Sequence, residues 1–432
     1  MFCQLELLRR CFPSSVRRIL EQLPDSLDET YERILREIRK PNQGHAHRLL
    51  QCLVVAVRPL EVKELAEVLA FDFNTGGMPK LNLSWRWEDQ EEAVTSACPS
   101  LVTIVKDGDS RVVQFSHFSV KEFLTADRLA EPIRDVSRYH IRVGAAHTIL
   151  AQACLGVLLS DDHIDRESIK GFPLALYASQ YWPTHARVES VSSCIKEGME
   201  CLFDAGKRHF STWLWIYNDD KQYYDKSMDA AYPEKPEAVP LYHAARLGFR
   251  DLAVHLITKD PEHVNAMGGE EVTPMHAAAS AGHANILSLL IEHGADVNGR
   301  GKWGHTPLHR ASVNAKLEAG QFLLDHGADI DARCDDETTA LMWAAIEGHV
   351  EFARMLLDRG ALIDERGYVG RTALHYAVLF EKTQFARLLL EHGADVNARD
   401  NDGLTPSERG LSYEHHEVVE LLSAFGAKSV VA

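Results

Sequence analysis

Apolar residues in the second half of the chain recur at a fixed distance of 33 residues. One register of leucines shows this period directly: Leu290, Leu323, Leu356, Leu389 and Leu422. Within each period, apolar positions lie three and four residues apart, as in the stretch ILSLLIEHG, and this spacing predicts short amphipathic helices. A period of this length is typical of a solenoid, because one unit cannot bury its apolar faces alone whereas stacked units can.

Polar and small residues mark where the predicted helices begin and end. Thr273 and Thr306 stand where a helix N-cap oxygen is needed, and the prolines that follow them suit the first helical position. Alanines such as Ala278 allow two short helices to pack closely. Gly294 and its equivalents, each followed by alanine, supply the left-handed C-cap that ends the second helix. The pattern therefore predicts pairs of helices that are joined by loops and stacked on one another.

This repeat resembles the ankyrin repeat, in six copies over residues 239–432. The first and last copies are atypical, with Tyr242 and Glu408 in the slot that usually holds histidine, as expected of solenoid caps. Two loops carry Glu271 and Glu337 where the others carry glycine. We expect these turns to be distorted or mobile, because a residue other than glycine resists a positive φ. The resemblance implies that a protein ligand binds the concave face.

In the ankyrin family the concave face consists of the loop tips and the exposed ends of the first helices. Carried onto this chain, the tips are Lys302, Trp303 and His305; Asp335 and Asp336; Tyr368, Val369 and Arg371; and Asn401 and Asp402. The helix ends are Val313 and Asn314; Ile346 and Glu347; and Leu379 and Phe380. Trp303, Tyr368 and Phe380 stand out because exposed aromatic side chains make good interface anchors, although each could equally be a surface residue without a partner. Trp343 and Tyr376 occupy a position that usually packs inward, so we expect them in the core.

The first half of the chain is predicted to hold helices followed by a β-hairpin. The stretch LPDSLDETYERILREIRK has Asp25 or Ser26 as a helix N-cap, and one helix face then comprises Leu27, Tyr31, Ile34, Leu35 and Ile38. Two further helices are separated at Pro59. After a polar loop, two β-rich runs around an Asp-Gly turn predict a hairpin, and the stretch SVKEFLTADRLA predicts a final helix. This order corresponds to a winged helix.

Three stretches of the first half resemble the segment that follows the NACHT domain in NLR-like proteins of filamentous fungi: LPDSLDETYERIL, FSHFSVKEFLTADRLA and LALYASQYWPTHA. They keep the family's order over residues 4–190, and ankyrin repeats are a common tail in that family. The resemblance implies four parts and a mainly α fold class. The parts are a post-NACHT-like helical segment at 1–40, a winged-helix domain at 41–130, a helical connector at 131–232 and the ankyrin repeats at 239–432.

His117 matches a winged-helix histidine that contacts the bound nucleoside diphosphate in NLR-type proteins. The match comprises Phe115, His117, Ser119, Glu122, Phe123 and Leu124. The alternative is that His117 caps the final helix or packs in the hairpin. The rest of the chain favours this alternative, because neither Gly-Lys pair has the upstream glycine and the following Ser or Thr of a phosphate-binding loop. The NACHT domain would precede Met1, so we expect a nucleotide partner only if such a domain exists.

Charge and composition narrow the choice of partners. The formal net charge is −17, and 17 − 28 = −11 of it lies in residues 240–432. This balance argues against nucleic acid, which requires clustered Lys and Arg, and Lys63 is isolated on its predicted helix. The eight cysteines form no CxxC pair, as expected of buried thiols in a reducing compartment. With neither a signal-peptide layout nor a run of about 18 apolar residues, we expect a cytoplasmic protein without a membrane partner.

Metal sites and catalytic motifs are not indicated. The stretch HEVVE from His416 lacks the second histidine of a zinc motif because Glu420 replaces it, and no G-x-S-x-G motif is present. We therefore expect no cofactor and no enzymatic activity. We interpret the chain as a protein-interaction module joined to the regulatory winged-helix part of an NLR-like receptor. The alternative is the C-terminal fragment of an NTP-hydrolysing NACHT switch that acts in fungal self/non-self recognition.

Overall fold

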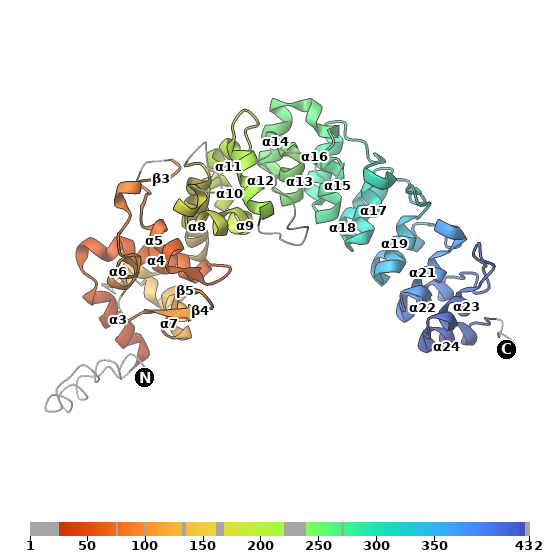
Figure 1. Cartoon of the computed structure of the whole chain (residues 1–432), viewed down its shortest axis with the longest axis horizontal. Helices are drawn as coiled ribbons and strands as arrows, with labels where there is room; N and C mark the ends of the chain where they lie inside the picture. The colour runs from red at the N-terminus through yellow and green to blue at the C-terminus, as the bar shows by residue number, and fades with distance from the viewer. Residues whose placement is uncertain are drawn as a thin grey trace. The chain divides into compact units, whose positions relative to one another are not determined.

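The computed structural model divides the chain into two compact units, residues 1–236 and 237–432 (Figure 1). It describes residues 26–74, 77–98, 100–131, 135–160, 168–219, 239–268 and 272–427. Helices dominate these ranges, which confirms the predicted mainly α fold class. The expected Asp25 cap and the expected Glu271 turn lie outside the described residues.

The first described helix, α3 (Leu27–Glu37), begins at the predicted cap. Ser26 is extended, and its side-chain oxygen accepts a hydrogen bond from the backbone N–H of Glu29 at 3.2 Å. The remaining residues of the predicted apolar face are buried: Tyr31, Ile34, Leu35 and Ile38. Leu27, the first residue of the helix, is 40% exposed, so the buried part of this face starts only after the first turn.

A winged helix follows, with its elements in the order helix, strand, helix, helix, strand, strand. They are α4 (Gln43–Val55), β1 (Leu60–Glu61), α5 (Val62–Val68), α6 (Gln90–Ala97), β4 (Val102–Asp107) and β5 (Ser110–Phe115). The strands form an antiparallel sheet in the order β1-β5-β4, and the β4–β5 hairpin turns at Gly108, whose φ is 58°. α7 (Phe118–Thr125) then packs on β5 and on α3, and it ends earlier than predicted.

Two elements of this region were not predicted. A two-stranded sheet pairs β2 (Phe71–Asp72) with β3 (Lys80–Leu81). α6 lies where the sequence suggested a polar loop; Asp89 caps it by accepting hydrogen bonds from the N–H groups of Glu91 and Glu92 at 2.9 and 3.0 Å. Short 3₁₀ helices link the elements: η2 (Lys40–Asn42), η3 (Leu83–Trp85), η4 (Asp127–Ala130), η5 (Ser137–Tyr139) and η6 (Ser168–Gly171).

A helical layer completes the described part of the first unit. It consists of α8 (Val143–Leu158), α9 (Ala175–Ala186), α10 (Val191–Cys194), α11 (Lys196–Leu202) and α12 (His209–Asp219). α8 packs against both α4 and α9, so it joins the winged helix to the other helices. Trp182 is fully buried at the centre of this layer, where its ring lies 6.1 Å from Phe203 and 5.8 Å from Trp213.

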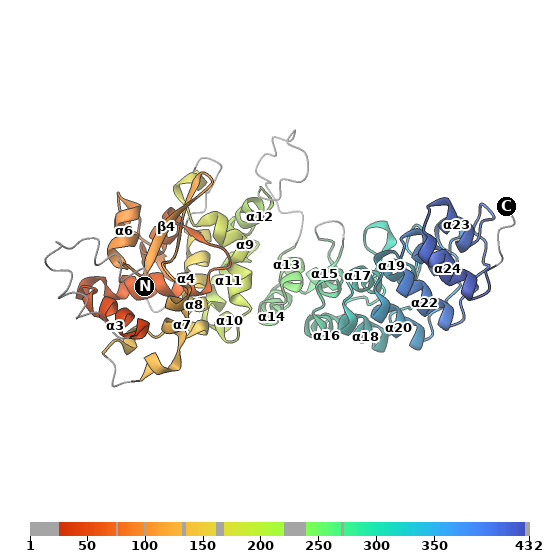
Figure 2. The ribbon, with the colours of Figure 1, turned by 90° about the horizontal axis from the view of Figure 1, so that it is seen from below.

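The second unit is a stack of six helix pairs. The pairs are α13 (Pro240–Leu247) and α14 (Arg250–Lys259); α15 (Pro274–Ala281) and α16 (Ala284–Glu292); α17 (Pro307–Val313) and α18 (Leu317–Asp325); α19 (Ala340–Glu347) and α20 (Val350–Asp358); α21 (Ala373–Leu379) and α22 (Thr383–Glu391); and α23 (Pro406–Ser412) and α24 (His416–Ala424). The first helices of the pairs contact one another in one row and the second helices in another (Figure 2). Further 3₁₀ turns lie at η7 (Pro261–Asn265), η9 (Lys302–Gly304) and η10 (Tyr368–Gly370).

The turn at Glu337 differs from expectation. Glu337 has a φ of 57°, and the glycines at the equivalent positions have φ values of 69°, 72° and 79° at Gly304, Gly370 and Gly403. Glutamate therefore adopts the left-handed conformation of glycine, and the expected distortion of this turn was wrong. The surrounding repeat holds the residue in an unfavourable backbone conformation, which costs about 1–2 kcal/mol for a residue that has a Cβ.

Candidate protein-interaction surface

Threonine–histidine pairs start three of the first helices and bind each one to the next repeat. In α17, Nδ1 of His309 accepts a hydrogen bond from the N–H of Thr306 at 3.1 Å, so its Nε2 carries the proton. That Nε2–H donates to the backbone oxygen of Thr338 in the next repeat at 3.0 Å. His276 and His375 make the same contacts. Each histidine therefore fixes the position of the loop that follows.

Burial keeps these histidines neutral. It lowers the pKa of His276 and of His309 to about 4, and it lowers the pKa of His375 as well. Met342 occupies the equivalent slot in the fourth repeat, and Glu408 occupies it in the sixth. The loops that carry the candidate binding residues are thus attached to the helices by buried hydrogen bonds in three repeats.

The loop tips associate in pairs. The backbone oxygen of Trp303 accepts a hydrogen bond from the N–H of Asp335 at 2.9 Å, and the backbone oxygen of Val369 accepts one from the N–H of Asn401 at 2.9 Å. Trp303 and Val369 both adopt a left-handed backbone, with φ values of 57° and 50°. This conformation is costly for a β-branched residue such as valine. Strained backbone of this kind is often found at binding sites.

Glycine is required beside each of these strained residues. Gly304 and Gly370 have positive φ values, and a Cβ at either position would overlap the side chain of the partner tip, Asp335 or Asn401. The two tip pairs therefore have the same construction and lie 66 residues apart (369 − 303 = 66). The sequence contains a motif with the same 66-residue spacing: R-G-x-x-G begins at Arg300 and again at Arg366.

Large aromatic side chains are exposed on these tips and on the nearby helix ends. Trp303 is 60% exposed, Tyr368 58% and Phe380 47%. Tyr413, which is 53% exposed, lies 33 residues after Phe380 in the equivalent position. Tyr413 was not predicted as a site residue, although the repeat period indicates it. The aromatic groups thus occupy two kinds of position, with Trp303 and Tyr368 on loop tips and Phe380 and Tyr413 at the ends of first helices.

The other predicted site residues differ in their exposure. Six are exposed: Asn314, Asp335, Asp336, Glu347, Asn401 and Asp402. Six are half-buried: Lys302, Val313, Ile346, Val369, Arg371 and Leu379. His305 is only 6% exposed, and its ring centre lies 5.2 Å from that of Trp343. His305 therefore packs against Trp343 beneath the exposed loop tip. Tyr376 is buried, as expected, and Trp343 is half-buried.

Carboxylates dominate the charge of the tips. Asp335, Asp336, Glu337 and Asp402 are exposed, although Asp335 lies 3.2 Å from the guanidinium of Arg300 and Asp402 forms an ion pair with Arg409. Nζ of Lys302 lies 4.9 Å from the centre of the Trp303 ring. Arg371 lies 4.0 Å from a buried carboxylate oxygen of Asp400, which Arg409 approaches to 2.6 Å. The surface therefore combines aromatic groups with negative charge.

His117 in the first unit caps a helix. Its backbone is extended, and its Nδ1 accepts a hydrogen bond from the N–H of Ser119 at 3.3 Å, which places it at the N-terminus of α7. The hydroxyl of Ser119 lies 2.6 Å from the same nitrogen and 2.7 Å from the hydroxyl of Tyr31 in α3. The imidazole is exposed to solvent. The structure thus gives His117 the capping role that was the alternative to nucleotide contact.

Known families match both units. Residues 31–133 match the family described as "GPI inositol-deacylase, winged helix domain", and the stretches 241–334, 314–367, 327–400 and 363–431 match "Ankyrin repeats (3 copies)". The chain has the NLR-like arrangement of a winged helix and ankyrin repeats. The resemblance predicted from the sequence is confirmed, and the ankyrin repeats indicate a protein-interaction module.

Two relatives show how far this similarity extends. The chain is 34% identical over 293 residues to the azaphilone pigments biosynthesis cluster protein L of Monascus ruber, which covers 64% of this chain and 61% of that protein. It is 44% identical over 55 residues to human BCL-6 corepressor-like protein 1, which covers 13% of this chain and 3% of that protein. The chain thus spans less than two thirds of the length of either relative.

No helix in the described part of the chain is both long and apolar enough to cross a bilayer. Within those residues, no group of three or more His, Cys, Asp or Glu side chains is placed to hold a metal ion. Ankyrin repeats themselves are non-catalytic.

Proposed function

We propose that the ankyrin unit recognises a protein ligand through the tip surface, which we define as Trp303, Asp335, Asp336, Tyr368, Phe380, Asn401, Asp402 and Tyr413. The observation that carries this proposal is the exposure of Trp303, Tyr368 and Phe380, each at 47% or more. Aromatic side chains supply a large part of the affinity of protein interfaces. Among the other predicted site residues, Ile346 and Leu379 are half-buried and Glu347 is exposed.

The construction of the tips supports the same function. A loop that is fixed before binding loses little conformational entropy when the ligand arrives, which favours affinity. Trp303 and Val369 are fixed by hydrogen bonds to the neighbouring tips, and Arg371 is held beside Asp400. In the fuller proposal, this ligand binding regulates an NLR-like receptor through the winged-helix unit. The protein is then a cytoplasmic binding protein, not an enzyme.

Peptide display on the full chain tests the tip surface. Random peptides would be selected on the wild-type protein, and their affinities compared with those for Trp303→Ala, Tyr368→Ala and Phe380→Ala. Loss of an aromatic anchor typically costs about 2 kcal/mol, which corresponds to a roughly 30-fold weaker affinity. Leu362→Ala is the matched control, because Leu362 is 54% exposed in the same unit but lies outside the tip surface. An equal loss of peptide affinity in the control and in the tip variants would contradict the proposal.

One observation favours the alternative function, in which the chain is part of an NTP-hydrolysing NACHT switch. His117 uses Nδ1 as an acceptor, so its neutral ring carries an N–H donor at Nε2, and the ring is exposed. A phosphate oxygen could accept from that donor if a NACHT domain presented a nucleotide. Adding a NACHT domain from a relative and comparing ADP affinity for the wild type and His117→Ala tests this role. Equal affinities would exclude it.

A further inference from the structure

Three large apolar side chains are exposed within five residues of the winged helix. Leu83 is 57% exposed, Trp85 48% and Trp87 50%. Single exposed apolar residues are ordinary on protein surfaces, but contiguous patches mark interaction sites. Trp85 and Trp87 also belong to the residue type that most often anchors protein interfaces.

The backbone under this apolar strip is fixed. The side-chain oxygen of Asn82 accepts a hydrogen bond from the N–H of Ser84 at 3.1 Å and caps η3. Arg86, between the two tryptophans, forms an ion pair with the buried carboxylate of Glu67 and places its guanidinium 5.4 Å from the Phe172 ring centre. The exposed tryptophans therefore flank an anchored residue, so their exposure does not come from a loose loop.

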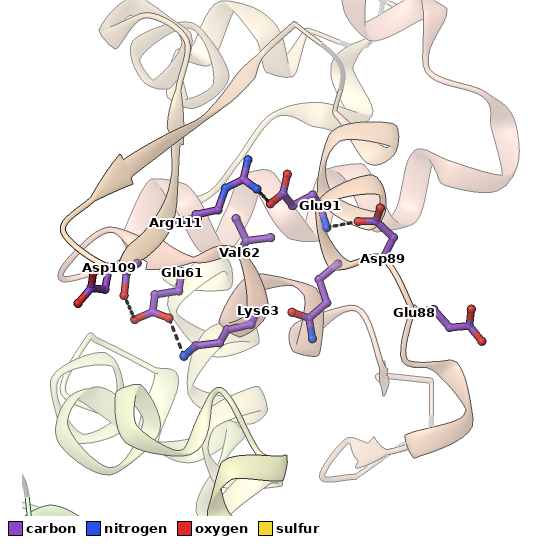
Figure 3. A pocket seen from close by; sticks show the side chains of 10 residues that line it. Glu61, Val62, Lys63, Glu88, Asp89, Glu91, Asp109 and Arg111 are labelled. Atoms are coloured by element: carbon purple, nitrogen blue, oxygen red, sulfur yellow. Dashed lines mark hydrogen bonds and ion pairs between the residues drawn. The ribbon is translucent and has the colours of Figure 1, made fainter.

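Two adjoining hollows extend the strip into the winged helix. Trp87 lines the smaller one, of about 230 Å³, together with Lys63, Gln90 and Pro173. Lys63 and Gln90 also line the larger hollow, of about 580 Å³. Figure 3 shows the larger hollow between the N-terminal ends of α5 and α6 and the turn of the β4–β5 hairpin.

The larger hollow is acidic. Its lining contains five carboxylates, Glu61, Glu88, Asp89, Glu91 and Asp109. It contains two cations, so the lining has a net charge of 2 − 5 = −3. Both cations are already paired within the lining: Nζ of Lys63 lies 2.9 Å from Glu61, and Arg111 forms an ion pair with Glu91 (Figure 3). The lining therefore repels a polyanion such as DNA and attracts positive charge.

We propose that Leu83, Trp85, Trp87 and the acidic hollow together form a docking surface for a basic, extended protein segment. Lysine or arginine side chains of the segment enter the hollow, whose lining includes Glu88, Asp89 and Asp109. Neighbouring side chains of the segment cover the indole rings, which also attract arginine through cation–π contacts. A second copy of this chain is a poor occupant, because each copy carries a net charge of −17.

This surface belongs to the first unit, whereas the tip surface belongs to the second. The two proposals therefore fail independently. Substitutions at the tips leave Trp85 and Trp87 unchanged, so variants of one unit can serve as controls for the other.

Fluorescence anisotropy on the full chain tests the docking surface. The probe is a short labelled peptide of alternating arginine and leucine, at physiological ionic strength. We expect the double variant Trp85→Ser/Trp87→Ser and the double variant Glu88→Lys/Asp109→Lys each to weaken binding about tenfold or more. The controls are Phe118→Ser and Glu122→Lys: both residues are exposed in the same unit and lie outside the surface, so we expect less than about a twofold change.

Three results would overturn the proposal. The first is wild-type affinity in both double variants, which would mean that the peptide binds only through the overall negative charge. The second is the absence of peptide binding to the wild type. The third is unchanged peptide binding by Trp85→Ser/Trp87→Ser together with loss of another interaction. That interaction would be self-association, measured by mass photometry, or binding to neutral lipid vesicles.

Discussion

Nδ1 of His147 and Nδ1 of His185 lie 2.8 Å apart, so the two imidazoles share one hydrogen between α8 and α9. The direction of this bond follows from its neighbours. The hydroxyl oxygen of Tyr177 accepts from the N–H of Val57 at 3.1 Å and donates its own hydrogen to Nε2 of His185, 2.9 Å away. His185 then carries its proton on Nδ1 and donates it to His147. A buried relay thus connects the winged helix to the helical layer.

This relay predicts acid sensitivity of the first unit. Burial, with a smaller effect of His147, lowers the pKa of His185 to about 4 from its ordinary value of 6.5. The unfolded chain therefore binds more protons than the folded chain between these values, and the stability present above pH 6.5 falls as the pH drops toward 4. Between pH 7 and pH 5 the free energy of unfolding of the wild type falls, and we expect this fall to be about 2 kcal/mol smaller in His185→Gln. Urea unfolding at both pH values measures the difference.

The control for this titration is His416→Gln, because His416 is exposed. The control variant should keep the wild-type dependence of unfolding free energy on pH. If His185→Gln also keeps it, the relay does not contribute to acid sensitivity.

The ankyrin histidines predict a second effect, which the chain itself helps to test. His309→Met copies the residue that the fourth repeat carries as Met342. It leaves the backbone oxygen of Thr338 and the N–H of Thr306 without their histidine partner, so we expect a loss of about 1–3 kcal/mol at pH 7. Because the pKa of His309 is about 4, the difference from the wild type should shrink as the pH falls from 6.5 toward 4. A difference that stays constant with pH would contradict this account.

Two turn substitutions should act in opposite directions. Glu337→Gly places glycine at a φ of 57° on an exposed turn, and we expect it to stabilise the ankyrin unit by about 0.5–1 kcal/mol. Gly370→Ala adds a Cβ at a φ of 72° that overlaps Asn401, and we expect a loss of at least about 1–2 kcal/mol. Thermal unfolding of both variants measures the signs, and two changes of the same sign would contradict the assigned turn geometry.

The glycine at the end of the second helix offers a test of conformation alone. Gly327 has a φ of 86°, and an added Cβ would meet no atom within 4 Å. Gly327→Val should therefore destabilise the stack by about 1–2 kcal/mol through the strain of a left-handed backbone at a β-branched residue. Gly327→Asn is the matched control, since asparagine tolerates the left-handed region and should cost less. Equal melting temperatures for wild type and valine variant would refute the capping role.

The sequence predicted those parts of the fold that depend on local pattern. The helix pairs followed from the 33-residue period, and the wing followed from two β-rich runs around Gly108. The helix α6 was missed because its stability comes from the Asp89 cap and an acidic first turn, while it buries only Ala93, Val94 and Ala97. So few apolar residues give no visible helical period.

The candidate surface was predictable in position but not in detail. The tip positions follow from the repeat, and Trp303 and Tyr368 are exposed as expected of anchors. The burial of His305 and the left-handed backbone of Val369 depend on contacts with the neighbouring repeat, Trp343 and Asn401 respectively. Such contacts between repeats are not visible in the sequence of a single repeat.

Pairing of the tips also limits how this array can change by recombination. Loss of the 33-residue repeat that carries Asp335 would set the carbonyl-presenting tips of Trp303 and Val369 side by side, and Trp303 would lose the amide that it now binds. An exchange of 66 residues keeps each carbonyl opposite an amide. The genetic unit that preserves this surface is therefore a double repeat, and unequal crossing-over by a single repeat would create a new recognition surface in one step.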